Sequence, residues 1–557
     1  MPKLLLEANR IVLRHGERTV LDIDHLTIYD NERVGLIGEN GAGKSTLLAI
    51  LAGELEPDSG AVKRYGPVSL IRQSGETRLP IDARHVAQFR VPDAREGLSG
   101  GEQTRRRIAG ALSEDAALLL ADEPTTDLDA AGIARLRQRL SEHRGALVLV
   151  SHDRSLLNDL CGRILHLEDG RVTDFPGGYE DYRAEQARRR EHQQFEYDQY
   201  RSEQARLRAA IQQKAEWAAS VKKAPKRMGN SEARLHTREY TNAVIHQSSA
   251  KRKLQGRLER LEKVDRPRDL PDIKMALGAA KPIAAKIALA ARCDRLTAGN
   301  RVLLEHADLT LPTGSRTALL GENGCGKTTL LRALRGAPSP GTRFDGKITW
   351  NPAARPAVFD QDHEKTLDLQ RTVLANAMAD TALGESDCRT VLARLGLRGD
   401  SVFKVAGVLS GGERAKVALA KLLLSGANLL ILDEPTNHLD LFAMEALEGL
   451  LAHYGGTLLF VSHDRAFVKA VATRLWTMEG GALTAFEGTL DALEAERRRD
   501  RSAEARQLAV TALEMRLAAL AARLSAPRKG DRPEELNAEY ERIAEELRRV
   551  KSSEFRV

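Results

Sequence analysis

The chain has 557 residues, of which 42% are hydrophobic and 29% are charged, and its net charge is +7 at neutral pH. This length exceeds what one hydrophobic core supports and predicts roughly three or four domains. No apolar run reaches the ~20 residues that span a bilayer, and residues 1–10 lack the apolar core of a secretion signal, so composition excludes a membrane-embedded protein and predicts a cytoplasmic one.

A phosphate-binding pattern occurs twice, as GENGAGKST at 38–46 and as GENGCGKTT at 321–329. Each copy follows a strand-like apolar run and opens a helix-like one, which is the context that the pattern requires. The glycines let backbone N–H groups curl around phosphate oxygens, the lysine reaches the outer phosphates and the Ser or Thr hydroxyl can bind Mg2+. The residues predicted to bind ATP are Gly38, Asn40, Gly41, Gly43, Lys44, Ser45 and Thr46, and Gly321, Asn323, Gly324, Gly326, Lys327, Thr328 and Thr329.

Three further motifs recur at one common offset of 311 residues. A repeat of this length predicts two versions of one domain, which we place at residues 1–178 and 284–490. The recurring motifs are LSGGEQTR at 98–105 with LSGGERAK at 409–416, LLLADEPTTDLD at 118–129 with LLILDEPTNHLD at 429–440, and VSHDR at 150–154 with VSHDR at 461–465.

The LSGGE motif resembles the signature of the ATP-binding cassette superfamily. It places a serine and two glycines just before an expected helix at 102–111, which makes a second anion-binding helix start. The resemblance implies a head-to-tail sandwich within one monomer, in which the phosphate loop of each half faces the signature of the other half across ATP. The signature residues expected to contact ATP are Ser99, Gly100, Gly101 and Glu102, and Ser410, Gly411, Gly412 and Glu413.

Each DEP motif ends an expected strand with two carboxylates. Asp122 and Asp433 are predicted to hold Mg2+ through water, and Glu123 and Glu434 to polarise the attacking water as catalytic residues. The same resemblance implies that His152 and His463 are switch histidines that contact the γ-phosphate. It also implies that two glutamine loops sense the metal, so the expected metal set is Ser45, Gln73, Asp122, Thr328, Gln361 and Asp433.

The halves also differ. Thr126 and Asp127 in TTDLD replace Asn437 and His438 in TNHLD, which leaves open whether the two sites turn over equally. The first half is 23 residues shorter between its glutamine loop and its signature, so residues 74–97 have no room for an inserted helical arm.

Residues 179–283 are predicted to form a long helical hairpin between the two domains. Residues 178–220 hold no proline or internal glycine and favour a helix, residues 221–230 break it, and a second run reaches residue 264. Residues 179–266 carry 21 Lys and Arg against 13 Asp and Glu. A solvated coiled coil explains the stem but not the tip, where we expect RNA contacts from Lys222, Lys223, Lys226, Arg227 and Met228.

Two fused ATPase halves with a charged helical linker resemble the ABC-F family over residues 1–490. The resemblance implies binding to the bacterial ribosome at the tRNA exit site, with the hairpin directed at 23S rRNA and peptidyl-tRNA. The absent arm and the tip sequence RMGNSEARLH at 227–236 resemble the antibiotic-resistance branch. The leading hypothesis is therefore protection of the ribosome from drugs of the peptidyl-transferase centre, with hydrolysis driving release and no obligate protein partner.

Three alternatives remain at this point. A housekeeping translation factor acting on stalled ribosomes would use the same chemistry without a drug. An exporter ATPase subunit would need a membrane partner, and a DNA-repair ATPase would need a zinc module or a very long coiled coil. Beyond residue 490, leucines spaced three and four apart predict a C-terminal helical hairpin at 491–557.

Overall fold

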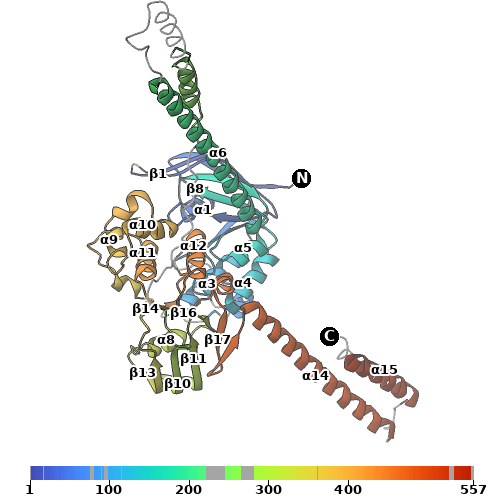
Figure 1. Cartoon of the computed structure of the whole chain (residues 1–557). Helices are drawn as coiled ribbons and strands as arrows, with labels where there is room; N and C mark the ends of the chain where they lie inside the picture. Colours follow the sequence, from blue (N-terminus) through green and yellow to red (C-terminus); the bar gives the residue numbers. More distant parts are fainter. Residues whose placement is uncertain are drawn as a thin grey trace, which may run out of the picture. The chain divides into compact units, whose positions relative to one another are not determined.

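The computed structural model describes residues 2–16, 18–75, 81–89, 91–92, 98–114, 116–128, 130–220, 245–246, 248–264, 282–360, 362–437, 439–525 and 532–552. The chain forms two compact units, Met1–Lys274 and Met275–Val557, which are treated separately below (Figure 1). Gln361 and the five predicted tip residues lie outside the described residues.

The first unit is built on a six-stranded sheet in the order β5-β6-β7-β3-β8-β9. All neighbours in it pair in parallel except β8 and β9. Every residue of β6 and β7 is buried, as expected for continuous apolar strands covered on both faces. The strands are β3 Arg33–Ile37, β5 Val68–Ile71, β6 Leu118–Asp122, β7 Ala146–Val150, β8 Arg163–Glu168 and β9 Arg171–Pro176.

A three-stranded antiparallel sheet, in the order β2-β1-β4, completes this domain. Helix α1 has apolar residues almost all round and shares one hydrophobic core with both sheets, which fixes the phosphate loop that precedes it. The remaining bounds are β1 Leu4–His15, β2 Arg18–Tyr29, β4 Ser59–Arg64, α1 Lys44–Ala52, α2 Ala83–Phe89, α3 Gly100–Leu112, α4 Ala130–Glu142 and α5 Arg154–Leu160.

The second unit repeats this plan, with sheets in the orders β14-β15-β16-β12-β17-β18 and β11-β10-β13. Between β14 and α11 it carries α9, α10 and three 3-10 turns, whereas α2 is the helix described at the corresponding place in the first unit. This accounts for the 23-residue difference, and the prediction of two α/β domains is confirmed. The elements are β10 Ile287–Ala298, β11 Arg301–Pro312, β12 Arg316–Gly321, α8 Lys327–Leu334, β13 Thr342–Trp350, β14 Pro356–Phe359, η1 His363–Thr366, α9 Val373–Ala377, α10 Glu385–Arg394, η2 Gly399–Phe403, η3 Ala406–Val408, α11 Gly411–Leu424, β15 Leu429–Asp433, α12 Leu441–Ala452, β16 Thr457–Val461, α13 Arg465–Val471, β17 Arg474–Glu479 and β18 Ala482–Glu487.

Helix α6, Tyr179–Ser220, is the first helix of the predicted linker and extends away from β8 (Figure 1). At about 1.5 Å per residue it is roughly 60 Å long. Its base is fixed, because Tyr179 and Tyr182 are buried and the ring of Phe175 packs against Tyr182. The side chain of Asn158, from α5, accepts the N–H of Glu180 at 2.9 Å. The linker helix is therefore joined directly to the helix that follows His152.

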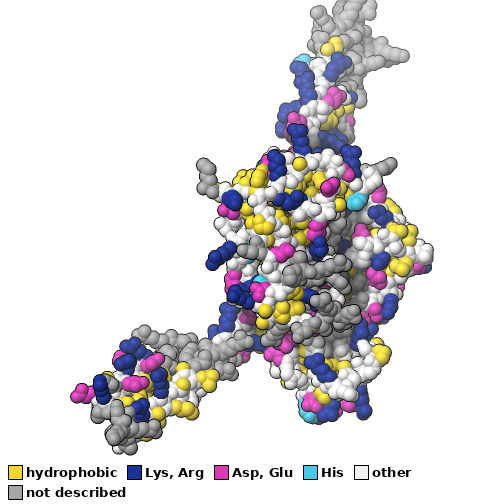
Figure 2. Space-filling model, turned by 180° about the vertical axis from the view of Figure 1, so that it is seen from behind, with side chains coloured by type: hydrophobic (Ala, Val, Ile, Leu, Met, Phe, Trp, Pro, Cys, Tyr) yellow, Lys and Arg dark blue, Asp and Glu magenta, His cyan; other side chains and the backbone are white. Residues whose placement is uncertain are grey.

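A second helix returns along α6, as the linker prediction requires. Residues 248–259 are helical, and Arg257 pairs with Glu203 of α6 at 3.1 Å. This helix ends at residue 259, before the expected end at residue 264. Figure 2 shows Lys and Arg interspersed with Asp and Glu along the described part of this arm.

The predicted C-terminal hairpin is confirmed as α14, Leu490–Ser525, and α15, Pro533–Ser552. Leu520, Leu536 and Ile543 form its small core. Leu490 lies 311 residues after Tyr179, so α14 is the repeat's counterpart of α6. Among the helices that the structure describes, none combines the length and the apolar character needed to cross a membrane.

Candidate nucleotide-binding sites

Both phosphate loops lie at the carboxyl end of a buried strand and the start of a helix. Gly43 and Gly326 cap these helices with φ angles of 104° and 107°, which favour glycine. The Lys44 ammonium donates to the carbonyl oxygens of Gly38 and Glu39 at 2.9 and 3.0 Å, and Lys327 repeats this with Gly321 and Glu322. The lysine thus bonds back to the start of its own loop and holds the loop in a curve, in which backbone N–H groups can bind phosphate oxygens.

The hydroxyl after each lysine meets the aspartate at the end of the neighbouring strand. Ser45 donates a hydrogen bond to Asp122, and Thr328 donates one to Asp433, while burial raises the pKa of both carboxyls. The Oδ1 atom of Asp433 is buried and has no hydrogen-bond partner among the described residues. Such hard oxygen donors fit Mg2+, which takes few protein ligands and completes its shell with water and phosphate. The described residues hold no cluster of three or more His, Cys, Asp or Glu side chains suited to a metal.

The two predicted catalytic glutamates share an uncommon backbone. Glu123 and Glu434 have φ angles of 46° and 50°, a left-handed conformation that costs free energy for a residue with a side chain. This turn directs each carboxylate toward the histidine of the next strand. The Nε2 atom of His152 lies 3.2 Å from Glu123 Oε1, and that of His463 lies 3.3 Å from Glu434 Oε1. The structure therefore brings each predicted glutamate and histidine together.

Burial raises the pKa of both glutamates, to about 8 for Glu123 and about 7 for Glu434. The lysine of the same phosphate loop opposes this shift, and the adjacent aspartate adds to it. A carboxylate whose pKa lies near neutral pH is matched to accepting a proton from water. The same residue destabilises the protein when it ionises, because its charge is then buried.

Each signature serine, Ser99 or Ser410, caps the helix that follows it. The hydroxyl of Ser99 donates to Glu102 Oε2 at 2.6 Å, and that of Ser410 donates to Glu413 Oε2 at 2.8 Å. The carboxylates also accept the backbone N–H of their serines, and the serine side chains accept the backbone N–H of the same glutamates, so both helix starts carry a capping box. Glu102 and Glu413 thus hold the signature serine in place, and their contact with ATP stays a prediction.

Comparison with known proteins agrees with this geometry. A family model described as ABC transporter matches residues 21–79, 76–126 and 304–437, and a second model with that description matches 165–275. The erythromycin resistance ATP-binding protein MsrA of Staphylococcus epidermidis is 33% identical, over 87% of this chain and 99% of the relative. The ribosome protection protein VmlR of Bacillus subtilis is 32% identical, over 81% of this chain and 83% of the relative.

The chain belongs to the ABC-F family. It is therefore an ATPase that binds ATP at its two cassette domains. A solved structure of RNase-L Inhibitor superimposes with a TM-score of 0.55 at 20% identity, covering 86% of this chain and 91% of the other. That likeness supports the fold of two tandem cassette domains.

The two glutamine loops of this ABC-F protein differ in the charge of the residue that precedes the glutamine. Gln73 is exposed, and Gln361 lies outside the described residues. The residue before each glutamine forms an ion pair with the segment that ends the phosphate-loop helix, but the charges are exchanged. Arg72 pairs with Glu54 at 2.6 Å in the first half, and Asp360 pairs with Arg335 at 2.8 Å in the second.

Sequence reasoning missed the residues that hold the histidine loops of this ABC-F fold. Asp153 caps α5 by accepting the N–H groups of Ser155 and Leu156, and Asp464 caps α13 in the same way. The Ser before each histidine accepts the N–H of this aspartate at 3.0 and 3.1 Å. The repeated SHD triplet was the available signal, since Ser and Asp before a helix favour capping.

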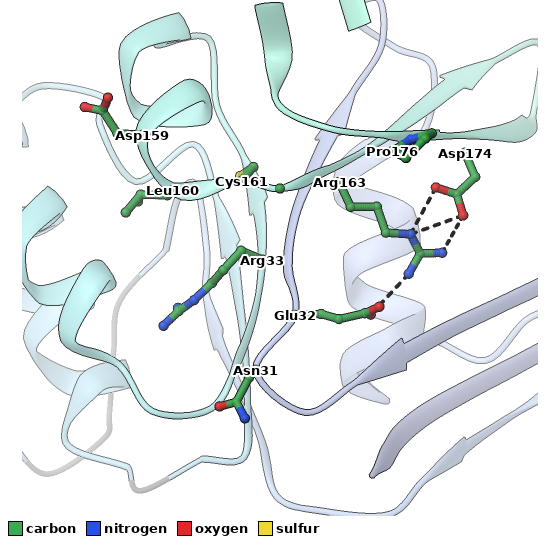
Figure 3. A pocket seen from close by; sticks show the side chains of 10 residues that line it. Asn31, Glu32, Arg33, Asp159, Leu160, Cys161, Arg163, Asp174 and Pro176 are labelled. Atoms are coloured by element: carbon green, nitrogen blue, oxygen red, sulfur yellow. Dashed lines mark hydrogen bonds and ion pairs between the residues drawn. The ribbon is translucent and has the colours of Figure 1, made fainter. Parts of the chain in front are cut away.

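Figure 3 shows a pocket of about 930 Å³ in the first unit, whose lining includes none of the predicted nucleotide residues. It opens at the starts of β3 and β8, whereas the phosphate loop follows the end of β3. Arg163 in this pocket is held by Asp174 and Glu32, as the dashed lines show. Arg33 donates to the backbone carbonyls of Leu140 and His143 at the end of α4. These arginines stabilise the domain rather than a ligand.

The raised pKa of Glu123 predicts a pH-dependent gain in stability for Glu123→Gln. In the unfolded chain the carboxyl titrates near 4.5, and in the folded protein near 8. The folded state therefore retains a proton that the unfolded state loses, so this residue lowers stability as pH rises from 4.5 to 8. Glutamine removes that penalty. We expect a gain on the order of a few kcal/mol at pH 8 and less than about 1 kcal/mol at pH 5.

Hydrogen exchange of peptides from β6 and β7, without nucleotide, measures this gain in the first unit alone. Glu142→Gln is the control, because Glu142 forms a surface pair with Arg139 and its loss should change stability by less than about 1 kcal/mol. Equal protection of wild type and Glu123→Gln at pH 8 would contradict a buried charge at this position.

Proposed function

We propose that this ABC-F ATPase binds the bacterial ribosome and protects it from antibiotics that act at the peptidyl-transferase centre. The observation that carries the proposal is the length of the match to MsrA, which spans 99% of a relative named for erythromycin resistance. VmlR, a relative named for ribosome protection, also matches over 81% of this chain. Both matches are too long to rest on the cassette motifs alone.

ATP drives this function through the two candidate sites. In the proposal, each nucleotide is shared between the phosphate loop of one half and the signature of the other. Glu123 and Glu434 polarise the attacking water, and His152 and His463 contact the γ-phosphate. Ser45, Asp122 and Gln73 in one half, and Thr328, Asp433 and Gln361 in the other, would hold Mg2+, which when bound would neutralise phosphate charge. Closure of the halves on ATP favours ribosome binding, and hydrolysis releases the ribosome.

The helical arm, which we assign to residues 179–283, is proposed to make the RNA contact at the tRNA exit site. Its basic surplus over residues 179–266 is +8, whereas residues 490–557 of the C-terminal hairpin carry only +1. Polyanion binding follows the local density of Lys and Arg, which favours the arm over the hairpin. The base of α6 supports this role, because its bond to α5 links the arm to the helix after His152. The tip basic residues at 222–227 would then face 23S rRNA and peptidyl-tRNA.

Expression in a drug-sensitive bacterium tests the proposal. Growth is measured against lincosamides, streptogramin A, pleuromutilins and macrolides, with an aminoglycoside as a drug acting elsewhere. We expect a rise of about fourfold or more in inhibitory concentration for at least one of the first four classes. Shortening residues 221–230 should abolish this rise and leave the basal ATPase rate nearly intact, since the deletion lies far from both candidate sites along the chain.

A deletion that removes ATPase activity together with resistance would identify the arm as a structural element and contradict its proposed contact with RNA. A housekeeping translation factor is the second outcome of the same experiment. It would bind ribosomes in ATP and change growth without any drug, while leaving all inhibitory concentrations unaltered.

A further inference from the structure

The signature of the first half carries an acidic neighbour that its repeat lacks in sequence. Asp127 stands in TTDLD, and the residue 311 positions later is His438. His438 lies outside the described residues, so the comparison at this position rests on sequence. Asp127 itself is described, and its backbone has a φ of 62°, a left-handed conformation that Asp and Asn tolerate better than other side chains.

This backbone turn places Asp127 directly against the start of α3. A Cβ atom on Gly100 would lie 2.8 Å from Asp127 Oδ2, and one on Gly101 would lie 2.7 Å from the backbone oxygen of Asp127. Both signature glycines are therefore required for this close approach. The consequence is that a carboxylate lies beside the first N–H groups of a helix, where an anion is favoured.

No cation of the described residues lies within ion-pairing distance of Asp127. Arg107 interacts with it only at longer range, and burial lowers the pKa of that guanidinium. The second signature differs, because the carboxylate nearest Gly411 belongs to Glu364, which pairs with Arg414 at 3.0 Å. The first signature thus faces an exposed and unneutralised charge, and the second faces a neutralised one.

We propose that Asp127 weakens ATP binding at the site which the first signature completes, and thereby makes the two ATP sites unequal. The inference rests on the proposed pairing of each signature with the phosphate loop of the other half. The γ-phosphate and the Asp127 carboxylate then compete for the same helix start. The affected nucleotide is the one held by Lys327 and hydrolysed with Glu434, while the nucleotide at Lys44 meets the neutralised second signature.

The size of the effect follows from the repulsion of two anions a few ångströms apart in a solvated site. It corresponds to about a three- to tenfold weaker affinity for ATP at moderate ionic strength. Because Asp127 is exposed, salt near 1 M should remove most of this loss of ATP affinity, since the Debye length is then about 3 Å. A change caused by lost packing would not vary with salt in this way.

The test uses the full chain without ribosomes, with Asp127→Asn in two single-site backgrounds. Asparagine keeps the size and tolerates the left-handed backbone while it removes the charge. In Glu123→Gln, where Glu434 alone hydrolyses ATP, we expect Asp127→Asn to lower the KM for ATP about three- to tenfold at 0.1 M salt, with little change at 1 M. In Glu434→Gln we expect the KM to stay within about twofold. The matched control is Thr126→Asn, the neighbouring uncharged difference.

An unchanged KM in the Glu123→Gln background would overturn the proposal, as would an effect that survives 1 M salt. A lowered KM in the Glu434→Gln background alone would also overturn it, because the first signature would then serve its own half. If the single-site variants do not turn over, equilibrium binding of ATP to Glu123→Gln/Glu434→Gln with and without Asp127→Asn decides the matter. With Asp127→Asn, one of the two sites should bind ATP more tightly. Failure to bind ribosomes would leave these nucleotide measurements unaffected, so the two proposals fail separately.

Discussion

Replacing Glu123 and Glu434 together with glutamine is expected to lower ATP turnover about 10²–10⁴-fold, the usual contribution of a positioned general base. Glu123 is buried and the Glu434 side chain is only 12% exposed. Each carboxylate faces the histidine that follows the neighbouring strand. Glutamine keeps the size of the side chain but cannot accept the proton of the attacking water. ATP binding should persist, since neither residue belongs to the phosphate loops or the signatures.

Phosphate release in the presence and absence of ribosomes measures this effect, and a filter assay with labelled ATP measures binding. The double variant should remain on ribosomes in ATP and sediment with them, whereas wild type should dissociate as hydrolysis proceeds. Glu142→Gln, on the surface of α4, is the matched control and should cycle normally. Release of the double variant at the wild-type rate would show that other residues are the bases.

The strained backbone at these glutamates was not accessible from the sequence. The strands expected to end at the two DEP motifs were predicted correctly, at 118–122 and 429–433, because continuous apolar residues suit a parallel sheet covered on both faces. The left-handed φ of Glu123 and Glu434 has no comparable sequence pattern, since no residue of the DEP motif favours that conformation. In both halves the glutamate N–H donates to the carbonyl of Val150 or Val461 in the neighbouring strand.

The correspondence between helix α6 of the arm and helix α14 of the C-terminal hairpin could have been predicted from the sequence. It follows from extending the 311-residue repeat beyond the last recurring motif. The 311-residue spacing of the VSHDR motifs continues to Tyr179 and Leu490, where α6 and α14 begin. The contacts at the two bases could not be predicted. Asn158 holds α6 through Glu180, whereas Lys469 holds α14 through an ion pair with Asp491 at 2.6 Å. Both halves thus place a long helix after the last strand of the sheet, but a hydrogen bond holds the base of α6 whereas an ion pair holds the base of α14.

Loss of the Lys416 side chain is expected to destabilise the second unit by about 3–5 kcal/mol, because it removes the ammonium that pairs with a buried carboxylate. Lys416 Nζ lies 2.6 Å from Asp440 Oδ2, and the side chains are only 7% and 2% exposed. The other oxygen of Asp440 caps α12 by accepting the N–H of Ala443. The pair thus joins the signature helix α11 to the start of α12, and no sequence pattern revealed it across 24 residues.

The comparison of Lys416→Met with Lys416→Met/Asp440→Asn separates this charge effect from lost packing. Methionine preserves most of the apolar stem, and asparagine preserves the helix cap. The double variant should recover most of the lost stability, since replacing both members of a buried pair is often nearly neutral. Arg371→Ala is the surface control, because Arg371 and Asp368 form an exposed pair whose loss should cost less than about 1 kcal/mol.

Unfolding of the second unit can be followed separately in a Trp217→Phe background. The two remaining tryptophans, Trp350 and Trp476, both lie in that unit, and Trp476 is fully buried. Urea titration of their fluorescence should therefore report the loss expected for Lys416→Met. If the single and double variants lose the same stability, the lysine stem rather than the charge pair fixes α11 against α12. The signature and the loop after the DEP motif would then be joined by apolar packing alone.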